Sequence, residues 1–231
     1  HKRAKLRKLK IITFGKNNKS DIFPLKSIKV KNVTKILLKI MNRKIDLEIK
    51  NINIYNVLAS IAVLREFNLN LSSIKKIFKN FEPTEGRGKT HTIFRYNKRF
   101  KLIDESYNAN PLSVKNAINS FDLIKKNKFK KYLILGDMLE LGPKSKKYHT
   151  DLSKVINKSN IDKVFIQGEK TLFTYKKLHK RKQGNILQNK SDIDLILSNI
   201  INNNDHLMIK GSNATGLNIL SKKMIRGLNV I

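Results

Sequence analysis

Residues 132–142 read YLILGDMLELG, and this stretch indicates the fold class. An unbroken apolar run, 132–135, ends at Gly136 and is followed by Asp137. Continuous apolar runs of this length are typical of strands that are buried on both faces of a parallel sheet. The glycine then permits a tight turn out of the strand. We therefore interpret 132–142 as a buried strand with its carboxyl-terminal turn.

On both sides of this stretch, short apolar runs alternate with segments of helical spacing. Repeated strand–helix units of this kind predict a mostly parallel sheet whose two faces are covered by helices. The predicted fold class is therefore α/β, with ligands expected at the carboxyl ends of the strands. The predicted strands are 92–96, 100–104, 132–135, 163–166 and 206–210, and the predicted helices are 112–126, 145–159, 170–179, 191–202 and 218–226.

Residues 1–82 have a different pattern, in which β-branched strands come first and a helix follows. We predict strands at 10–14, 27–33, 35–40 and 45–49, and a helix at 53–67. Residues 82–89, EPTEGRGK, combine Pro, two Gly and four charged residues, which is typical of a linker. The chain is therefore predicted to contain two domains, 1–82 and 83–231.

The formal net charge of +32 is the most unusual property of the composition. A positive field of this size attracts nucleic acid, so a basic nucleic-acid-binding α/β domain is one hypothesis. Only 9 of the 49 basic residues are Arg, however, and Arg is better suited than Lys to bidentate phosphate and base contacts. The lysine clusters at 125–131 and 176–182 are therefore interpreted as solvated surface, and no specific nucleic acid is expected.

Composition also limits the class of protein. The absence of Cys excludes disulfides and thiolate metal sites. No apolar run approaches the length of a membrane span, and residues 1–10 lack the apolar region of a secretory signal. We expect a cytoplasmic protein without a membrane span.

Polar segments that follow predicted strands are the candidates for chemistry. Residues 104–111, DESYNANP, place two adjacent acids before a Pro that suits the first turn of a helix. A polar turn with a helix cap explains this segment equally well. Residues 209–216, IKGSNATG, could bind an anion with backbone N–H groups, but a simple turn is the commoner explanation. His149 has no second His or acid at ligand spacing, so no metal site is predicted.

Taken together, these segments resemble the Mur ligase family. The resemblance is carried, in this order, by GRGK at 86–89, DESYNANP at 104–111, GDMLELG at 136–142, His149 and KGSN at 210–213. It covers most of the chain, and it implies that 83–231 is a Rossmann-like carboxyl-terminal domain. Residues 1–82 would be the later part of the central α/β ATP-binding domain. The implied activity is that of an ATP-dependent amide ligase.

The resemblance implies nucleotide contacts for five residues. Asn53 and Asn56 match a helix start whose side chains meet adenine, although the preceding family His is replaced here by Ile. Arg87 matches the linker arginine that reaches the ATP phosphates, a role that suits a guanidinium group. Asp104 or Glu105 matches the acid that holds the nucleotide after the domains close, and Glu105 is favoured.

The resemblance also implies that the polar turns bind D-alanyl-D-alanine. The implied residues are Tyr107, Asn108, Asn110, Ser212 and Asn213. Many relatives carry Arg at the last of these positions, so an anion-clamping role does not transfer to Asn213. Asp137 and His149 are expected to hold these residues in position without contacting the substrate themselves. No catalytic residue is expected in this part of the ligase.

The implied substrates are ATP, UDP-N-acetylmuramoyl-tripeptide and D-alanyl-D-alanine, with Mg²⁺ as the metal cofactor. In the family, the phosphate-binding loop and the Mg²⁺ ligands come before the positions matched here, and GxxxxGK(S/T) does not occur in this chain. We therefore expect a carboxyl-terminal part of the enzyme that is monomeric and inactive as a ligase by itself.

Overall fold

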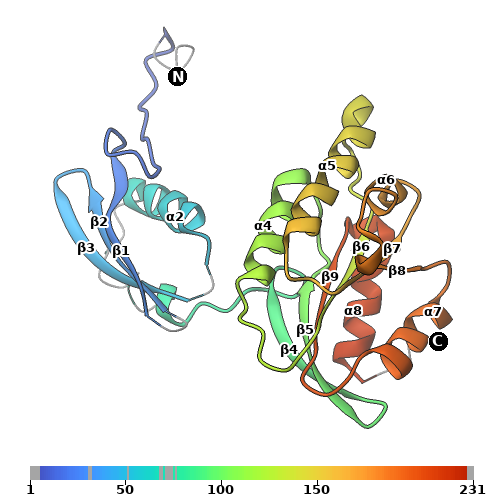
Figure 1. The fold of residues 1–231 in the computed structure, drawn as a ribbon. Helices are drawn as coiled ribbons and strands as arrows, with labels where there is room; N and C mark the ends of the chain where they lie inside the picture. Colours follow the sequence, from blue (N-terminus) through green and yellow to red (C-terminus); the bar gives the residue numbers. More distant parts are fainter. Residues whose placement is uncertain are drawn as a thin grey trace. The chain divides into compact units, whose positions relative to one another are not determined.

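The computed structural model divides into two compact units, His1–Pro83 and Thr84–Ile231 (Figure 1). The structure describes residues 6–30, 33–50, 52–67, 70, 75 and 77–227. The first unit contains one cluster of buried apolar side chains and the second contains two. Each unit therefore has a core of its own.

The first unit is an antiparallel sheet with a helix packed on it. Its strands lie in the order β1 (Ile22–Val30), β2 (Val33–Ile40) and β3 (Arg43–Ile49). Every second side chain of β2 from Ile36 to Ile40 points into the core, as the alternation of a strand requires. Helix α2 (Ile54–Glu66) covers this face with the apolar side chains of its inner side.

Two predictions for the first unit are wrong in detail. The predicted strand 10–14 is reduced to a single bridge to Ile22, because the Thr13 backbone N–H donates to the Asp21 carboxylate instead, at 2.7 Å. Strand β1 begins at Ile22, before the predicted start at residue 27 and in spite of Pro24. The register shifts just after Pro24, and β1 is an edge strand, where proline is tolerated.

The second unit is built on a sheet with the strand order β4-β5-β9-β6-β7-β8. The strands are β4 (Lys89–Arg95), β5 (Lys98–Glu105), β6 (Lys131–Gly136), β7 (Lys163–Gln167), β8 (Gln183–Ile186) and β9 (His206–Lys210). The β4 strand pairs antiparallel with β5, and the other neighbours pair in parallel. This confirms the predicted α/β fold with a mostly parallel sheet.

Helices cover both faces of this sheet (Figure 1). One face carries α4 (Pro111–Asp122), α5 (Ser145–Lys158) and α6 (Thr171–Tyr175), and the other carries α7 (Lys190–Leu195) and α8 (Leu217–Ile225). Along β6, Tyr132 and Ile134 pack toward α8, whereas Leu133 and Leu135 pack toward α4 and α5. All of β6 is buried, which explains its unbroken apolar run.

The structure differs from the predicted elements where local sequence is least informative. Strand β8 was not predicted, because its sequence QGNI has no apolar run. It is an edge strand, and the Tyr175 hydroxyl helps to hold it by donating to the Gly184 carbonyl at 2.7 Å. The predicted helices 112–126 and 170–179 end earlier, at Asp122 and Tyr175. The predicted helix 191–202 is α7 followed by a π-helical turn.

Two lysines of the clusters that were predicted to be solvated are in fact buried. They are Lys131, the last residue of 125–131, and Lys182, the last residue of 176–182. The Lys131 ammonium donates to the last two carbonyls of α4 at 2.9 Å, and the Lys182 ammonium donates to two carbonyls just after α5 at 2.7 Å. A cation at the carboxyl end of a helix satisfies free carbonyls there. Burial lowers the pKa of both lysines.

The wild type is expected to lose stability at alkaline pH through Tyr132, and Tyr132→Phe is expected to abolish that part of the loss. Burial, reinforced by Asp205 and Asp162, raises the pKa of Tyr132 from 10.0 to about 12. Between these values the unfolded chain loses the phenol proton while the folded chain keeps it. The free energy of unfolding of the wild type therefore falls with rising pH, by about 1.4 kcal/mol per unit.

Urea unfolding of both proteins at about pH 8 and about pH 11 measures this effect. The stability of wild type relative to Tyr132→Phe should fall by about 1 kcal/mol between the two conditions. The other alkaline groups titrate in both proteins, so their contributions cancel. A difference that stays constant with pH would contradict the prediction.

Candidate functional site

Strands β5, β9 and β6 lie side by side, and the chain leaves their carboxyl ends toward different faces of the sheet. It passes from β5 into α4 and from β6 into α5 on one face, and from β9 into α8 on the other. In open α/β sheets, neighbouring connections that diverge in this way mark the carboxyl edge at which ligands bind. The polar segments named from sequence fall at this edge.

Ser212 joins the three loops that leave these strands. Its backbone N–H donates to the Asp137 carbonyl at 3.0 Å, and its hydroxyl oxygen accepts from the Leu139 N–H at 3.0 Å. The hydroxyl also donates to the Ala109 carbonyl at 3.3 Å. The loops after β5, β6 and β9 therefore form one connected edge. Ser212 is buried by these contacts, whereas Asn213 beside it is exposed.

Lys210, which the sequence analysis did not assign, is the buried cation of this edge. It ends β9 with 2% exposure. Its ammonium donates to the Asn108 carbonyl at 2.6 Å, the Glu105 carboxylate at 3.2 Å and the Glu105 carbonyl at 3.3 Å. Burial lowers the pKa of Lys210, while the adjacent Glu105 opposes that shift and Arg87 adds to it. A charged residue that ends an otherwise apolar strand was the signal available in the sequence.

Arg87 lies in the turn that precedes β4, and its side chain is exposed. The guanidinium carbon is 4.4 Å from the centroid of the Tyr107 ring, within cation–π range. Among the residues that the structure describes, no carboxylate forms an ion pair with it. Its charge and its donors therefore remain available to an anion.

The two adjacent acids have different surroundings. Asp104 is 1% exposed, and its carboxylate accepts hydrogen bonds from Gly86 and Ser106. Glu105 pairs with Lys210, and its side chain is 25% exposed. Of the two carboxylates, that of Glu105 is the one that solvent can reach.

The remaining polar side chains of 104–111 divide between solvent and the fold. Tyr107 and Asn108 are exposed, and the Asn108 side chain accepts from the next backbone N–H at 2.7 Å. Asn110 begins α4: its side-chain oxygen accepts from the Ser113 N–H at 2.8 Å, and the Ser113 hydroxyl accepts from the Asn110 N–H at 3.0 Å. This reciprocal pair is a capping arrangement. The helix cap that the sequence left as an alternative is therefore present.

Asp137 and His149 support the loop after β6. The Asp137 carboxylate accepts from the backbone N–H groups of Lys170 and Thr171 at 3.2 and 2.8 Å, which fixes the start of α6. His149 is fully buried; its Nε2 accepts from the Met138 N–H at 3.0 Å, and its Nδ1 lies 2.9 Å from the Ser145 carbonyl. These partners require a neutral ring with the proton on Nδ1.

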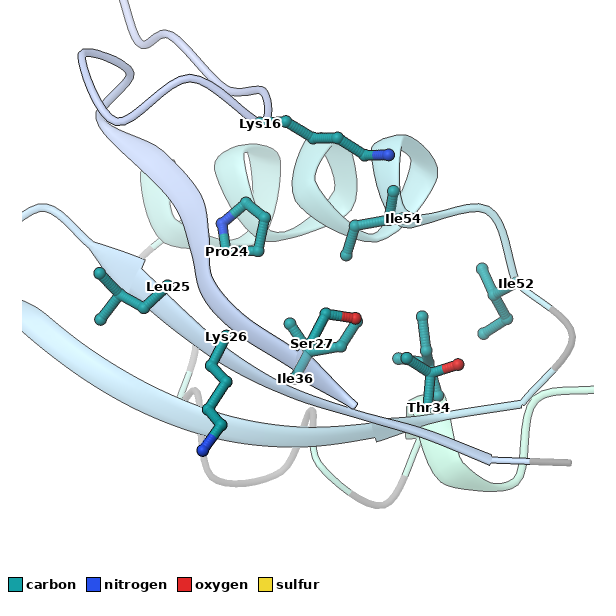
Figure 2. A pocket seen from close by; sticks show the side chains of 10 residues that line it. Lys16, Pro24, Leu25, Lys26, Ser27, Thr34, Ile36, Ile52 and Ile54 are labelled. Carbon is teal, nitrogen blue, oxygen red and sulfur yellow. The ribbon is translucent and has the colours of Figure 1, made fainter. Parts of the chain in front are cut away.

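Asn53 and Asn56 belong to the first unit, where both are exposed at the start of α2. The Asn53 side chain accepts from the Tyr55 N–H at 2.9 Å and so caps this helix. Beside the helix start lies a hollow of about 450 Å³ whose lining includes Ile52 and Ile54. Figure 2 shows it between α2 and the strands, with Lys16 reaching over it from the loop before β1.

Two negative findings apply to the described part of the chain. Within those residues there is no group of three or more His, Cys, Asp or Glu that could hold a metal ion. Nor does any helix found there have both the length and the apolar character needed to cross a bilayer.

Comparison with known proteins agrees with the geometry. A family model described as Mur ligase, glutamate ligase domain, matches residues 92–213. The UDP-N-acetylmuramoyl-tripeptide--D-alanyl-D-alanine ligase of Bacillus subtilis is 32% identical over 117 residues, 51% of this chain and 25% of that protein. The ligase of the same name from Buchnera aphidicola subsp. Baizongia pistaciae is 29% identical over 178 residues, 75% of this chain and 36% of that protein. The chain thus matches about a quarter to a third of the length of these relatives.

Solved structures share the fold. MurF from Acinetobacter baumannii superposes with a TM-score of 0.76 at 22% identity, over 97% of this chain and 49% of that chain. The MurF ligase from Thermotoga maritima, solved in complex with ADP, gives a TM-score of 0.72 at 18% identity, over 98% of this chain and 52% of that chain. These likenesses extend over both units of the chain.

His149→Ala is expected to destabilise the second unit more than His149→Gln. The alanine leaves the buried Met138 N–H without an acceptor and opens a cavity, at a combined cost of about 3 kcal/mol. The glutamine side chain can place an oxygen where Nε2 lies and recover part of that loss. Urea unfolding of the two variants and the wild type measures the difference. Equal stability of the two variants would show that the hydrogen bond to Met138 contributes nothing.

Proposed function

The chain belongs to the Mur ligase family, and on that premise we propose that it is part of an ATP-dependent ligase that joins D-alanyl-D-alanine to UDP-N-acetylmuramoyl-tripeptide. Both curated relatives described above are named for this activity. The edge at the carboxyl ends of β5, β9 and β6 would be this chain's share of the active site. The alternative of a nucleic-acid-binding domain has no support from the relatives found.

One observation carries this proposal: among the residues that the structure describes, no carboxylate pairs with the guanidinium of Arg87, which lies beside this edge. It rests on the Tyr107 ring at 4.4 Å instead of beside a carboxylate. A guanidinium can donate two parallel hydrogen bonds to a phosphate, and such charge-assisted bonds are stronger than neutral ones. We assign Arg87 to the phosphates of ATP and of the acyl phosphate formed from it.

The proposed reaction has two steps. The terminal carboxylate of the tripeptide attacks the γ-phosphate of ATP, which forms an acyl phosphate and releases ADP. The amino group of D-alanyl-D-alanine then attacks the acyl carbon, and the tetrahedral intermediate expels phosphate as the amide forms and the amine loses a proton. Arg87 would stabilise negative charge on the transferred phosphate in both steps. The polar loops would hold the attacking amine in line.

The polar loops suit a dipeptide with charged ends. Tyr107, Asn108 and Asn213 are exposed and offer hydroxyl and amide groups to it. Asn110 and Ser212 already have partners within the fold, so their contribution would be to shape the loops. Glu105, beside Lys210, is our choice for the acid that meets the nucleotide.

ATP is the proposed nucleotide, and Asn53 and Asn56 are proposed for its adenine. Their position on the exposed start of α2 supports that assignment. In the family Mg²⁺ supplies charge neutralisation at the phosphates, but the described residues contain no cluster that fits it. We therefore assign no Mg²⁺ ligand to this part of the chain. The cytoplasmic location and the monomeric state remain predictions.

A chimaera tests the function. In the Bacillus subtilis relative, the carboxyl-terminal domain would be replaced by residues Thr84–Ile231 of this chain. We expect phosphate release from ATP and the UDP-linked tripeptide that depends on D-alanyl-D-alanine. Arg87→Ala should lower that rate about 100-fold, the usual order for removing a preorganised charge-stabilising donor, and Arg87→Lys should lower it less.

Arg99→Ala is the matched control, because Arg99 is an exposed arginine at the opposite end of β5. Its rate should equal that of the unaltered chimaera. A folded chimaera without dipeptide-dependent phosphate release would contradict the proposed function. A rate that survives Arg87→Ala would contradict the role of Arg87 alone.

A further inference from the structure

The turn that carries Arg87 is tied to the end of β5 on both sides of the arginine. The Gly86 N–H donates to the Asp104 carboxylate at 2.9 Å, and the Gly88 N–H donates to the Asp104 carbonyl at 2.7 Å. In return, the Tyr107 N–H donates to the Gly86 carbonyl at 3.1 Å. Arg87 therefore lies between two residues whose backbone N–H groups both donate to Asp104.

Both oxygens of the Asp104 carboxylate accept hydrogen bonds from neighbouring residues. One oxygen accepts from Gly86, and the other accepts from the Ser106 N–H at 3.2 Å and the Ser106 hydroxyl at 2.6 Å. With 1% of the residue exposed, no part of this carboxylate is free to meet a ligand. Buried carboxylates with several donors of this kind hold local structure.

The same turn brings the guanidinium onto the Tyr107 ring. Gly86 has a φ of +76°, a conformation that favours glycine, and a Cβ there would lie 2.8 Å from the Tyr107 Cβ. The missing side chain lets the turn approach close enough for Arg87 to stack at 4.4 Å. The backbone bonds to Asp104 and the ring contact thus fix the two ends of the arginine.

We propose that Asp104 is a positioning residue for Arg87. It does not contact the nucleotide; it anchors the turn at residues 84–88, so that the guanidinium stays over the Tyr107 ring and presents its donors to phosphate. The identity of the anion rests on the proposed function, whereas the anchoring rests on the hydrogen bonds alone. Tyr107 then serves as the platform for Arg87 in addition to lining the dipeptide side.

Charge and positioning make opposite predictions for Asp104→Asn. Removal of a negative charge near Arg87 should strengthen phosphate binding, because Coulomb repulsion of the anion is reduced. Loss of the anchor should weaken phosphate binding instead. A carboxamide has one accepting oxygen and a donating nitrogen, so the Gly86 N–H and the Ser106 N–H cannot both keep their acceptor. Whether Asp104→Asn raises or lowers the affinity for phosphate therefore distinguishes the charge effect from the positioning role.

Nuclear magnetic resonance of the 231-residue chain tests the anchor directly. Arg87 side-chain protons over an aromatic ring should show upfield ring-current shifts and contacts to the Tyr107 ring protons. Asp104→Asn should lose both signals, as should Tyr107→Leu. Glu85→Gln, which removes an equal charge from an exposed side chain of the same turn, should keep both. Unchanged amide signals for the buried strand β6 would confirm that each variant is folded.

Calorimetric titration with inorganic tripolyphosphate then links the anchor to binding. Arg87→Ala should weaken the affinity about tenfold, the effect of losing one charge-assisted interaction. Asp104→Asn should weaken it similarly, and the two changes together should weaken it no further. The surface lysines are the same in every protein of this set, so differences in affinity within the set do not come from them.

Two results would overturn the inference: retention of the Arg87 ring-current shift in Asp104→Asn, or tighter tripolyphosphate binding by that variant. Loss of the shift in Asp104→Asn, combined with an Arg87→Ala affinity equal to wild type, would support the anchor while contradicting the phosphate role of Arg87. The failure of the inference is therefore distinguishable from the failure of the proposed function.

Discussion

The close approach of two strand ends is the constraint on which the rest of the site edge depends. Gly136 ends β6 and Gly211 follows β9; a Cβ on Gly136 would lie 3.3 Å from the Gly211 Cα and 2.6 Å from Cδ1 of Leu217. Without these side chains, Leu217 of α8 packs over both strand ends, and the Ser212 N–H reaches the Asp137 carbonyl at 3.0 Å. A Cβ at either glycine would lie less than 3.0 Å from Leu217 Cδ1 and 3.2 or 3.3 Å from the Cα of the other glycine, so Leu217 would have to move and the strand ends would be crowded. The polar groups can be gathered along one edge because the backbone beneath them is closely packed.

The burial of each cation at this edge, more than the number of cations, decides whether its charge is available to a ligand. Lys210 is enclosed, and its ammonium is satisfied by the side chain and carbonyl of Glu105 at the end of β5 and by the Asn108 carbonyl in the loop that follows. Its charge therefore stabilises the loop and is not available to a ligand. Arg87 lies on an aromatic ring, which holds its position without neutralising it. A net charge of +32 consequently says little about this edge, because the surroundings of each cation decide whether its charge is available to a ligand.

Sequence predicted the features that are determined locally. The central strands were found because burial on both faces makes their apolar runs continuous, and the helices near 145–159 and 218–226 were found because one face of each is apolar. Strand β8 was missed because an edge strand with half-exposed side chains needs no such run. The burial of Lys131 also could not be predicted, because its ammonium meets carbonyl groups at the end of α4, a contact that depends on tertiary packing. For the candidate site, spacing alone left a functional turn and a helix cap equally plausible, and the resemblance to a family supplied the roles.

The two acids at the end of β5 show where sequence reasoning reaches its limit. Successive side chains of a strand point to opposite faces, so Asp104 and Glu105 must have different partners even though they are neighbours. Glu105 lies on the side of Lys210, which follows from the parallel pairing of Glu105 with Lys210 in β5 and β9. Asp104 meets the turn before β4, which follows from the antiparallel pairing of Lys89 with Asp104. Neither pairing register can be read from the sequence of residues 104–111. Two identical charges therefore take on different tasks because one strand pairs with a parallel neighbour on one side and an antiparallel neighbour on the other.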